Sequence, residues 1–195
     1  MKSPSRIYLE KLLHQNREYI QGKVLNVGGG PKPYRHLSKN MVNMDLFISQ
    51  EVNIKADITK NFPIKKNTFD TVICTQVLEH VENPKKVIEE IHKATKKNGT
   101  LILSTPFLER YHPDPKDYWR FTEDGLRILL KNKFEIIHIH PIGGRIIWFA
   151  CFMHLHRIIP RICLGTINHI SSYFDKHEKN KNTWTYGFFI IAKKL

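Results

Sequence analysis

Short apolar runs alternate along the chain with amphipathic segments. Runs at 24–27, 69–75 and 100–104 are rich in β-branched residues and too short for a buried helix. The continuous run at 69–75 is typical of a strand that is covered on both faces. Asn83-Pro84 opens a segment with helical spacing, because Asn is a favoured cap and Pro fits the first turn. Strands that alternate with helices predict a doubly wound, mostly parallel α/β sheet with helices on both faces.

The expected elements follow one another closely. Only residues 47–52 separate the second and third strands, which leaves no room for a full crossover helix. The predicted order is a helix over 5–22 capped by Ser5 and ended by Gly22, strands at 24–27, 41–46, 53–58, 69–75, 100–104 and 134–140, helices after Asn83 (to Lys97) and Thr122, and a last strand at 184–192.

A long detour, 143–182, precedes the last strand. It is almost entirely apolar from Arg145 to Met153, and Pro160 separates this part from a second amphipathic pattern at 167–174. The uninterrupted apolar run is far shorter than the ~18 residues that a membrane-spanning helix needs. Three interpretations stay open: a helical cap over the site, a homodimer face, or a peripheral membrane contact through 145–174. The first two are favoured, since most amphipathic helices pack on protein.

Length and composition describe one globular domain. The 195 residues are 41% hydrophobic and 25% charged, which suits a single buried core. We divide it into an N-terminal helix (5–22), a cofactor-binding core (23–142), a helical insertion (143–182) and the final strand (183–195). The three cysteines have neither disulfide nor zinc-site spacing, and residues 1–6 lead into no apolar signal segment. A cytoplasmic protein is the simplest expectation.

The formal net charge is +13. Such a charge is compatible with nucleic acid, an anionic membrane surface or a phosphorylated substrate as partner. The lysines are scattered along expected helix faces and turns rather than gathered in one block. A solvated basic surface is therefore the favoured interpretation.

Candidate chemistry gathers where the first three strands end. Gly28, Gly29 and Gly30 follow the first strand, Asp45 ends the second and Asp57 ends the third. Glycines let a ligand approach the backbone, and a carboxylate after the second strand can accept hydrogen bonds from a ribose diol. Each acid alone could be a turn former. Together they predict a nucleoside-binding edge.

These residues resemble those of class I S-adenosylmethionine-dependent methyltransferases, of the type 11-like group that acts mainly on small molecules and glycans. The most specific part of the resemblance is Phe69–Val81, which reads FDTVICTQVLEHV; the segments 24–30 and 56–58 add to it. A nicotinamide dehydrogenase would instead show GxGxxG opening a full helix. The resemblance implies a Rossmann-like sheet of about seven strands with an antiparallel last strand.

The resemblance also implies how S-adenosylmethionine binds. The glycines would flank its amino-acid moiety, Asp45 would hold the ribose and Asp57 the adenine amine. Asn26 departs from the family, which usually has an acid there, and Lys32 stands where a third glycine is common. The implied cofactor contacts are Asn26, Gly28, Gly29, Gly30, Asp45, Leu46, Asp57, Ile58, Thr75 and Gln76.

Two histidines are the candidate catalytic residues. His80 follows the fourth strand beside the expected methyl group, and histidine is the commonest general base, although Glu79-His80 could also have a structural role. His112 lies in a proline-stiffened aromatic loop after the fifth strand, where substrate contacts are common. That loop supplies the candidate acceptor-binding residues Tyr111, Asp117, Tyr118, Trp119 and Arg120; the alternative is a packed loop with an internal ion pair.

A metal-dependent variant is the less favoured interpretation of the same segment. Ubiquinone-pathway and small-RNA 2′-O-methyltransferases carry a Glu-x-x-Glu-His cluster for a divalent ion after this strand. Here Gln76 replaces the first glutamate, which leaves Glu79, His80 and His112. Loss of one anionic ligand weakens a site for a hard cation, so we expect no metal.

The resulting prediction is O-methylation of a small molecule or a sugar or glycan hydroxyl. A nucleic-acid methyltransferase is one alternative, but the Asn/Asp-Pro-Pro-aromatic tetrad of base-amino methyltransferases is absent. A non-catalytic binding or assembly module is the other, motivated by Asn26 and the 143–182 segment.

Overall fold

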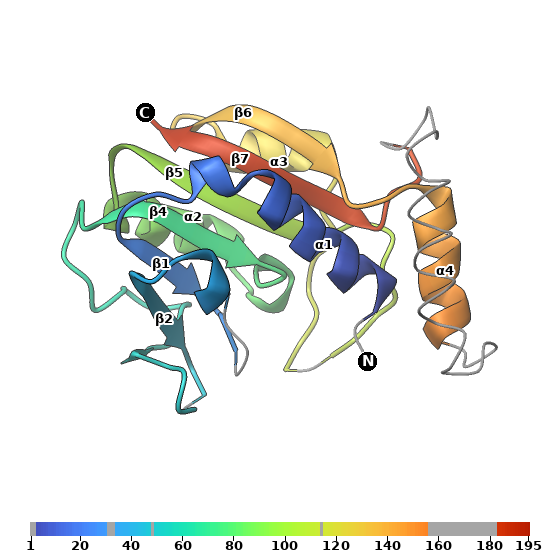
Figure 1. Ribbon diagram of the computed structural model, residues 1–195, viewed down its shortest axis with the longest axis horizontal. Coiled ribbons are helices and arrows are strands. Elements are labelled where there is room, and N and C mark those ends of the chain that lie inside the picture. Colours follow the sequence, from blue (N-terminus) through green and yellow to red (C-terminus); the bar gives the residue numbers. More distant parts are fainter. Residues whose placement is uncertain (1–2, 31–33, 48, 114, 156–182) are drawn as a thin grey trace.

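A single seven-stranded sheet in the order β3-β2-β1-β4-β5-β7-β6 organises the protein (Figure 1). The computed structural model describes residues 3–30, 34–47, 49–113, 115–155 and 183–195. Every described pairing between β1, β2, β3, β4 and β5 is parallel, whereas β7 runs antiparallel to both β5 and β6. The predicted sheet and its antiparallel last strand are thus confirmed. The strands are β1 Val24–Val27, β2 Met41–Asp45, β3 Ile54–Lys55, β4 Phe69–Thr75, β5 Thr95–Pro106, β6 Phe134–Pro141 and β7 Gly187–Lys194.

Helices cover both faces of the sheet. On one face, α1 (Pro4–Gln15) buries Leu9 and Leu13 against side chains of β1, β4 and β7. On the other, α2 (Pro84–Ala94) and α3 (Glu123–Leu130) bury Ile88 and Leu126 in the larger core. The fourth helix, α4 (Arg145–Leu155), lies beside α1 at one end of the sheet (Figure 1).

The predicted caps of α2 and α3 are confirmed, and that of α1 is wrong. The Asn83 and Thr122 side chains accept hydrogen bonds from the backbone amides of Lys86 and Gly125. In α1 the cap is Ser3, because Pro4 takes the first helical position and Ser5 is buried within the first turn. This helix ends at Gln15 and a 3₁₀ turn follows at Arg17–Tyr19, so Gly22 does not end it.

Several predicted strand boundaries also need correction. β3 is reduced to Ile54–Lys55, as the short connection before it allows little pairing. β5 begins at Thr95, because α2 ends at Ala94 and the chain extends at once, with Asn98 at a φ of 59°. β7 is shifted to Gly187–Lys194, since its register follows β5 from Thr100 to Pro106.

The detour at 143–182 is described only as far as Leu155. Helix α4 is apolar on most sides, and Phe149 and Phe152 are 56% and 40% exposed. The predicted second helix at 167–174 lies outside the described residues. Within the described ranges, no helix has both the length and the apolar character that a membrane crossing requires.

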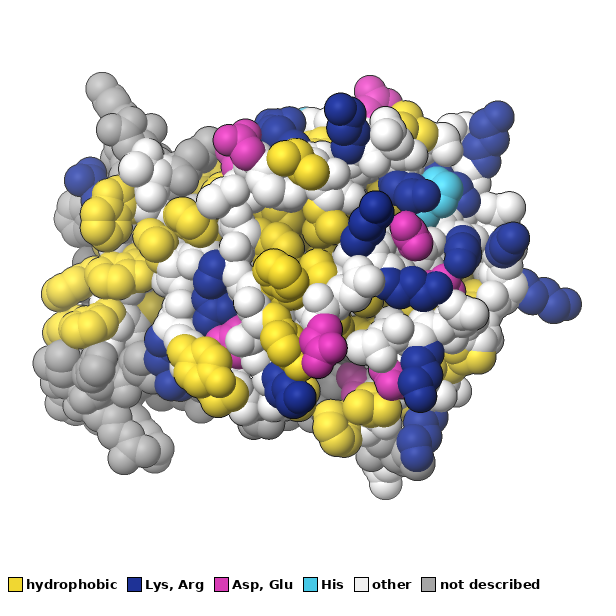
Figure 2. Space-filling view, turned by 180° about the vertical axis from the view of Figure 1, so that it is seen from behind, with side chains coloured by type: hydrophobic (Ala, Val, Ile, Leu, Met, Phe, Trp, Pro, Cys, Tyr) yellow, Lys and Arg dark blue, Asp and Glu magenta, His cyan; other side chains and the backbone are white. Residues whose placement is uncertain are grey.

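Basic side chains are spread over the face that carries α2 and α3. Figure 2 shows Lys and Arg there interspersed with acidic and apolar side chains. Some are paired locally, as Lys86 and Lys93 are with Glu90. This face therefore agrees with the interpretation of the charge as a solvated surface.

Candidate functional site

The glycine loop leaves β1 in a conformation that requires glycine. Gly28 and Gly30 have φ values of 65° and 60°, in the left-handed region. A Cβ on Gly28 would lie 2.6 Å from a methyl carbon of Val77, whereas one on Gly30 would meet no atom within 4 Å. The loop is thus packed against the segment after β4 at its start and open at Gly30.

Asp45 holds the loop from the end of β2. Its Oδ2 accepts a hydrogen bond of 2.8 Å from the Gly30 amide, and its Oδ1 accepts one of 2.9 Å from Phe47. The residue is buried, while the neighbouring Leu46 is half exposed. Because a carboxylate can accept about four hydrogen bonds, Asp45 retains capacity for a ligand hydroxyl.

Asn26 is bound to a second amide. Its Nδ2 donates to Oδ1 of Asn43 at 3.0 Å, and both side chains are buried. Between them lies Gly29, where a Cβ would fall 1.8 Å from the Asn43 oxygen and 2.2 Å from the Asn26 nitrogen. Asn26 therefore supports the loop from beneath.

Asp57 and Ile58 follow β3 at the same edge and are partly exposed. The Asp57 carboxylate accepts hydrogen bonds from the hydroxyl and the amide of Thr59, which hold its pKa below the ordinary value. Asp57 is therefore an ionised acceptor at neutral pH.

Thr75 ends β4 at this edge, and Gln76 follows it directly. The Thr75 hydroxyl lies 3.1 Å from the hydroxyl of Tyr34. Gln76 has a φ of 55°, and its Nε2 donates to Oγ of Ser104 at 3.2 Å. The Gln76 side chain is thus bound to the end of β5.

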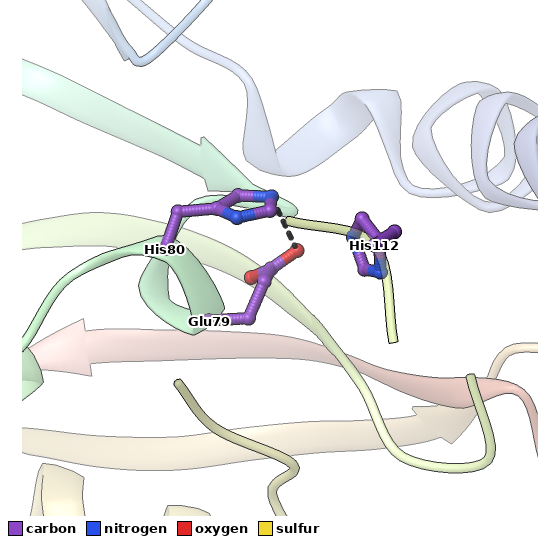
Figure 3. A group of neighbouring side chains, drawn as sticks. All are labelled: Glu79, His80 and His112. Atoms are coloured by element: carbon purple, nitrogen blue, oxygen red, sulfur yellow. Dashed lines mark ion pairs between the residues drawn. The ribbon is translucent and has the colours of Figure 1, made fainter. Parts of the chain in front are cut away.

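Beyond Gln76, the fold brings together Glu79, His80 and His112 (Figure 3). The first two come from the 3₁₀ turn Leu78–His80, and His112 comes from the loop after β5. Nε2 of His80 lies 3.9 Å from Oε1 of Glu79, and the rings of the two histidines meet edge to face at 5.1 Å. The two residues predicted to be catalytic are therefore neighbours in space.

Glu79 is fully buried within this group. Its side chain is 0% exposed, and neither carboxylate oxygen has a hydrogen-bond partner. Burial raises the pKa of Glu79 to about 8. The protein alone therefore favours the neutral carboxylic acid at pH 7.

The loop at 107–121 is fastened to the turn that carries Glu79. The Tyr118 amide donates to the Glu79 carbonyl, the Tyr118 hydroxyl to Glu82, and the Trp119 indole to the Val81 carbonyl. These bonds connect the sequence-predicted acceptor loop to the turn after β4. Among the candidate acceptor residues, Tyr111 is the most exposed, at 69%.

An ion pair lies inside the same loop. Arg120 donates to both oxygens of Asp117, at 2.5 and 2.7 Å, and the Asp117 side chain is 0% exposed. The Arg120 guanidinium holds the pKa of Asp117 well below its usual range. Asp117 also accepts from the amide of His112. The pair thus fixes the shape of the loop around His112.

Two neighbouring cavities open beside these groups. A cavity of about 360 Å³ is bordered by His112, Glu109 and Trp148. A smaller one, of about 130 Å³, reaches Gln76, and both share Ser3, Ser5 and Tyr186 as lining residues. The expected methionine contact and the acceptor loop therefore face adjoining space.

Sequence reasoning missed several residues of this space. Ser3, Ser5 and Arg6 come from the start of α1, and Trp148 comes from α4. Glu109 is also new: its Oε2 is buried without a partner, and burial raises its pKa. Neither spacing nor a motif marks these residues, because only the packing of α1 and α4 brings them to this edge.

Comparisons with known proteins agree with this architecture. A family model described as a methyltransferase domain matches residues 34–103. An uncharacterized protein of Methanocaldococcus jannaschii is 29% identical over 146 residues, covering 67% of this chain and 69% of that protein. The mitochondrial ubiquinone biosynthesis O-methyltransferase of Schizosaccharomyces pombe is 50% identical over 38 residues, covering 20% of this chain and 14% of the relative.

The solved structures show the same fold. A SAM-dependent methyltransferase from Archaeoglobus fulgidus aligns with a TM-score of 0.66 at 16% identity, covering 98% of this chain and 95% of that one. Both the sheet order and the family match are those that the sequence resemblance predicts. The chain therefore belongs to the class I S-adenosylmethionine-dependent methyltransferases and is an enzyme that uses S-adenosylmethionine as its methyl donor.

Proposed function

We propose that the enzyme methylates a hydroxyl oxygen of a small molecule, with a sugar or glycan hydroxyl among the candidate acceptors. The observation that carries this proposal is the cavity of about 360 Å³ at His112, which adjoins the smaller cavity at Gln76. Groups that can take a proton, His112 and Glu109, line the larger cavity. An oxygen acceptor needs such groups, because a neutral hydroxyl must lose its proton during methyl transfer.

The cofactor is assigned to the edge formed by the first four strands. Its ribose goes to Asp45, its adenine to Asp57 and Ile58, and its methionine part to the space between the glycine loop and Thr75-Gln76. The open position at Gly30 supports this placement, since a ligand can approach the backbone there. The partly free capacity of the Asp45 carboxylate also fits a ribose diol.

The reaction is an in-line displacement. The acceptor oxygen forms a bond to the methyl carbon, the carbon–sulfur bond breaks, and its electron pair stays on sulfur to give S-adenosylhomocysteine. The hydroxyl proton leaves toward the proton-accepting groups of the cavity wall, His112 and Glu109. Alignment of the acceptor with the sulfonium supplies much of the rate, so a rigid loop around His112 is an advantage.

The cavity wall favours an acceptor with a ring. Trp148, Phe152 and Tyr186 present aromatic surfaces, while Glu109 and Arg110 offer polar contacts. Aromatic faces stack against sugar or phenol rings, and the polar groups bind their hydroxyls. The Schizosaccharomyces pombe relative, named as an O-methyltransferase, is in line with an oxygen acceptor.

The proposal is tested by transfer of a tritiated methyl group from S-adenosylmethionine to fractionated cell extract. We expect label in a small-molecule or glycan fraction with the wild type and with Asp124→Ala, an exposed control on α3. His112→Ala should lose most of the transfer while retaining cofactor binding. Label in RNA would favour the nucleic-acid alternative, and cofactor binding with no labelled fraction would favour a binding module.

A further inference from the structure

The Glu79 carboxyl group has no hydrogen-bond partner although it is completely buried. Burying such a group without compensation is costly, and buried carboxylates are normally paired or bound to a metal. Arg120, the cation of the neighbouring loop, is engaged by Asp117 through two hydrogen bonds. Glu79 thus points to a ligand that the described side chains do not supply.

The imidazoles of His80 and His112 lie beside the Glu79 carboxyl group (Figure 3). Glu79, His80 and His112 each offer a ligand atom, and these atoms lie within 4.8 Å of one another. Three ligands at about 2.1 Å from a common ion in tetrahedral geometry lie about 3.4 Å apart. Side-chain movements of about an ångström would therefore close the group around one ion.

Each histidine is oriented by its other nitrogen. Nδ1 of His80 is hydrogen-bonded to the carbonyl of Lys116. Nδ1 of His112 lies 3.0 Å from the carbonyl of Arg110 and 3.3 Å from Oδ2 of Asp117. Histidines that bind metals usually donate their second N–H to a carbonyl or a carboxylate in this way. The arrangement leaves Nε2 of each ring for a ligand.

The composition of the group decides which ion it suits. Gln76 lies three residues before Glu79, but it carries no charge and its amide is bound to Ser104. The group therefore provides one carboxylate and two imidazoles. Mg²⁺ and Ca²⁺ require shells of oxygen ligands, whereas imidazole suits divalent transition ions.

We propose that Glu79, His80 and His112 form a binding site for a divalent transition-metal ion such as Zn²⁺, Mn²⁺, Fe²⁺ or Co²⁺, which discriminates against Mg²⁺. This departs from the sequence-based expectation of a metal-free enzyme. Three protein ligands leave coordination positions open, and the cavity at His112 gives access to them. The catalytic role of this metal site rests on the proposed function. A cation bound here would act as a Lewis acid on the acceptor hydroxyl and would lower the pKa of that hydroxyl.

The test uses the tag-free 195-residue chain, stripped with EDTA and titrated with Co²⁺. We expect one Co²⁺ per chain, with visible absorption bands that Zn²⁺ abolishes and a thousandfold excess of Mg²⁺ leaves in place. Glu79→Gln and His112→Ala should each weaken Co²⁺ binding at least tenfold. His36→Ala, which removes a histidine from the remote 3₁₀ turn Arg35–Leu37, should bind like the wild type.

Gln76→Glu adds a negative charge next to the site with little change in side-chain size. It should increase Mg²⁺ affinity, because a second carboxylate is added three residues before Glu79. Circular dichroism checks that each variant is folded; should Glu79→Gln unfold, His112→Ala provides the same comparison from the loop. Equal Co²⁺ binding by the wild type and the folded variants, or displacement by equimolar Mg²⁺, would overturn the proposal.

The two proposals can fail separately. Methyl transfer to a hydroxyl by metal-stripped protein, with no spectral response to Co²⁺, would remove the metal site and leave the proposed function standing. A one-to-one Co²⁺ complex that depends on Glu79, in an enzyme that methylates no hydroxyl, would support the metal site and refute the proposed function.

Discussion

Asn26 donates a hydrogen bond of 3.0 Å to the side-chain oxygen of Asn43, and the two amides form a buried pair under the glycine loop. The Asn43 nitrogen donates in turn to the carbonyls of Gly30 and Glu51. Its oxygen is thereby directed toward Asn26. The residue at position 26, which departs from the family pattern, is uncharged because the Asn43 oxygen needs a hydrogen-bond donor, and the Asn26 amide supplies it.

Asn26→Asp should therefore destabilise the protein. A carboxylate at position 26 places one acceptor against another and leaves the Asn43 oxygen unpaired, at a cost of about 1–3 kcal/mol. Urea unfolding measures this loss. Asn40→Asp makes the same change at an exposed position and should cost much less. Equal unfolding midpoints for the two variants would refute the matched-pair explanation.

Adjacent glycines should respond differently to alanine. Gly29→Ala drives a methyl group into the Asn26–Asn43 pair, whereas Gly30→Ala meets open space and has only the cost of its positive φ, about 1–2 kcal/mol. Thermal unfolding should rank Gly29→Ala as the less stable variant. The opposite order would mean that the loop has a different conformation in solution.

Asp45→Ala should lower cofactor affinity by at least tenfold. The substitution removes a charge-assisted acceptor from the proposed ribose site and frees the Gly30 amide. Calorimetry with S-adenosylhomocysteine gives the dissociation constants. Asp124→Ala on α3 removes the same charge far from this edge and should bind like the wild type; loss of affinity in both variants would contradict the assignment of Asp45.

Asp70 should make stability depend on pH. Hydrogen bonds from Lys96 and from the amide of Lys23 hold its pKa below the ordinary value. The stabilisation is thus complete above the unfolded pKa of about 3.9 and is lost as pH falls through the lower folded pKa. Asp70→Asn should be less stable than the wild type at neutral pH, and the difference should shrink in acid.

Urea midpoints across this pH range, at low and high salt, provide the measurement. Because Asp70 and Lys96 are partly exposed, salt should reduce the difference as well. A difference that stays constant from neutral pH into acid would show that the Asp70 charge is not responsible.

The fold could be predicted because its signals are local. Asn83-Pro84 and Thr122 determine where α2 and α3 begin, and the buried runs at 69–75 and 100–104 are central strands with apolar neighbours on both faces. The start of α1 was predicted two residues late, since Ser3 and Ser5 are both suitable caps and only packing distinguishes them. The length of β3 depends on pairing with β2, which no local pattern encodes.

The candidate site also has one part that the local sequence predicts and another that depends on long-range contacts. Its proposed cofactor edge follows from residues at or just after the ends of strands: Asp45 ends β2, and Asp57 lies two residues after β3. Its acceptor side depends on contacts between segments far apart in sequence: His112 reaches Glu79 only because the loop at 107–121 is bonded to the turn after β4. Residues of α1 and α4 enter through packing alone.

In the proposed reaction, the methyl group ends on a hydroxyl oxygen of a small acceptor. The most direct measurement is NMR of the product formed from S-adenosylmethionine carrying a ¹³C-labelled methyl group and the active extract fraction. We predict the carbon signal of a methyl ether, strong with the wild type and strongly reduced with His112→Ala. A methyl carbon bonded to nitrogen, sulfur or carbon, or a label carried by RNA, would contradict the account.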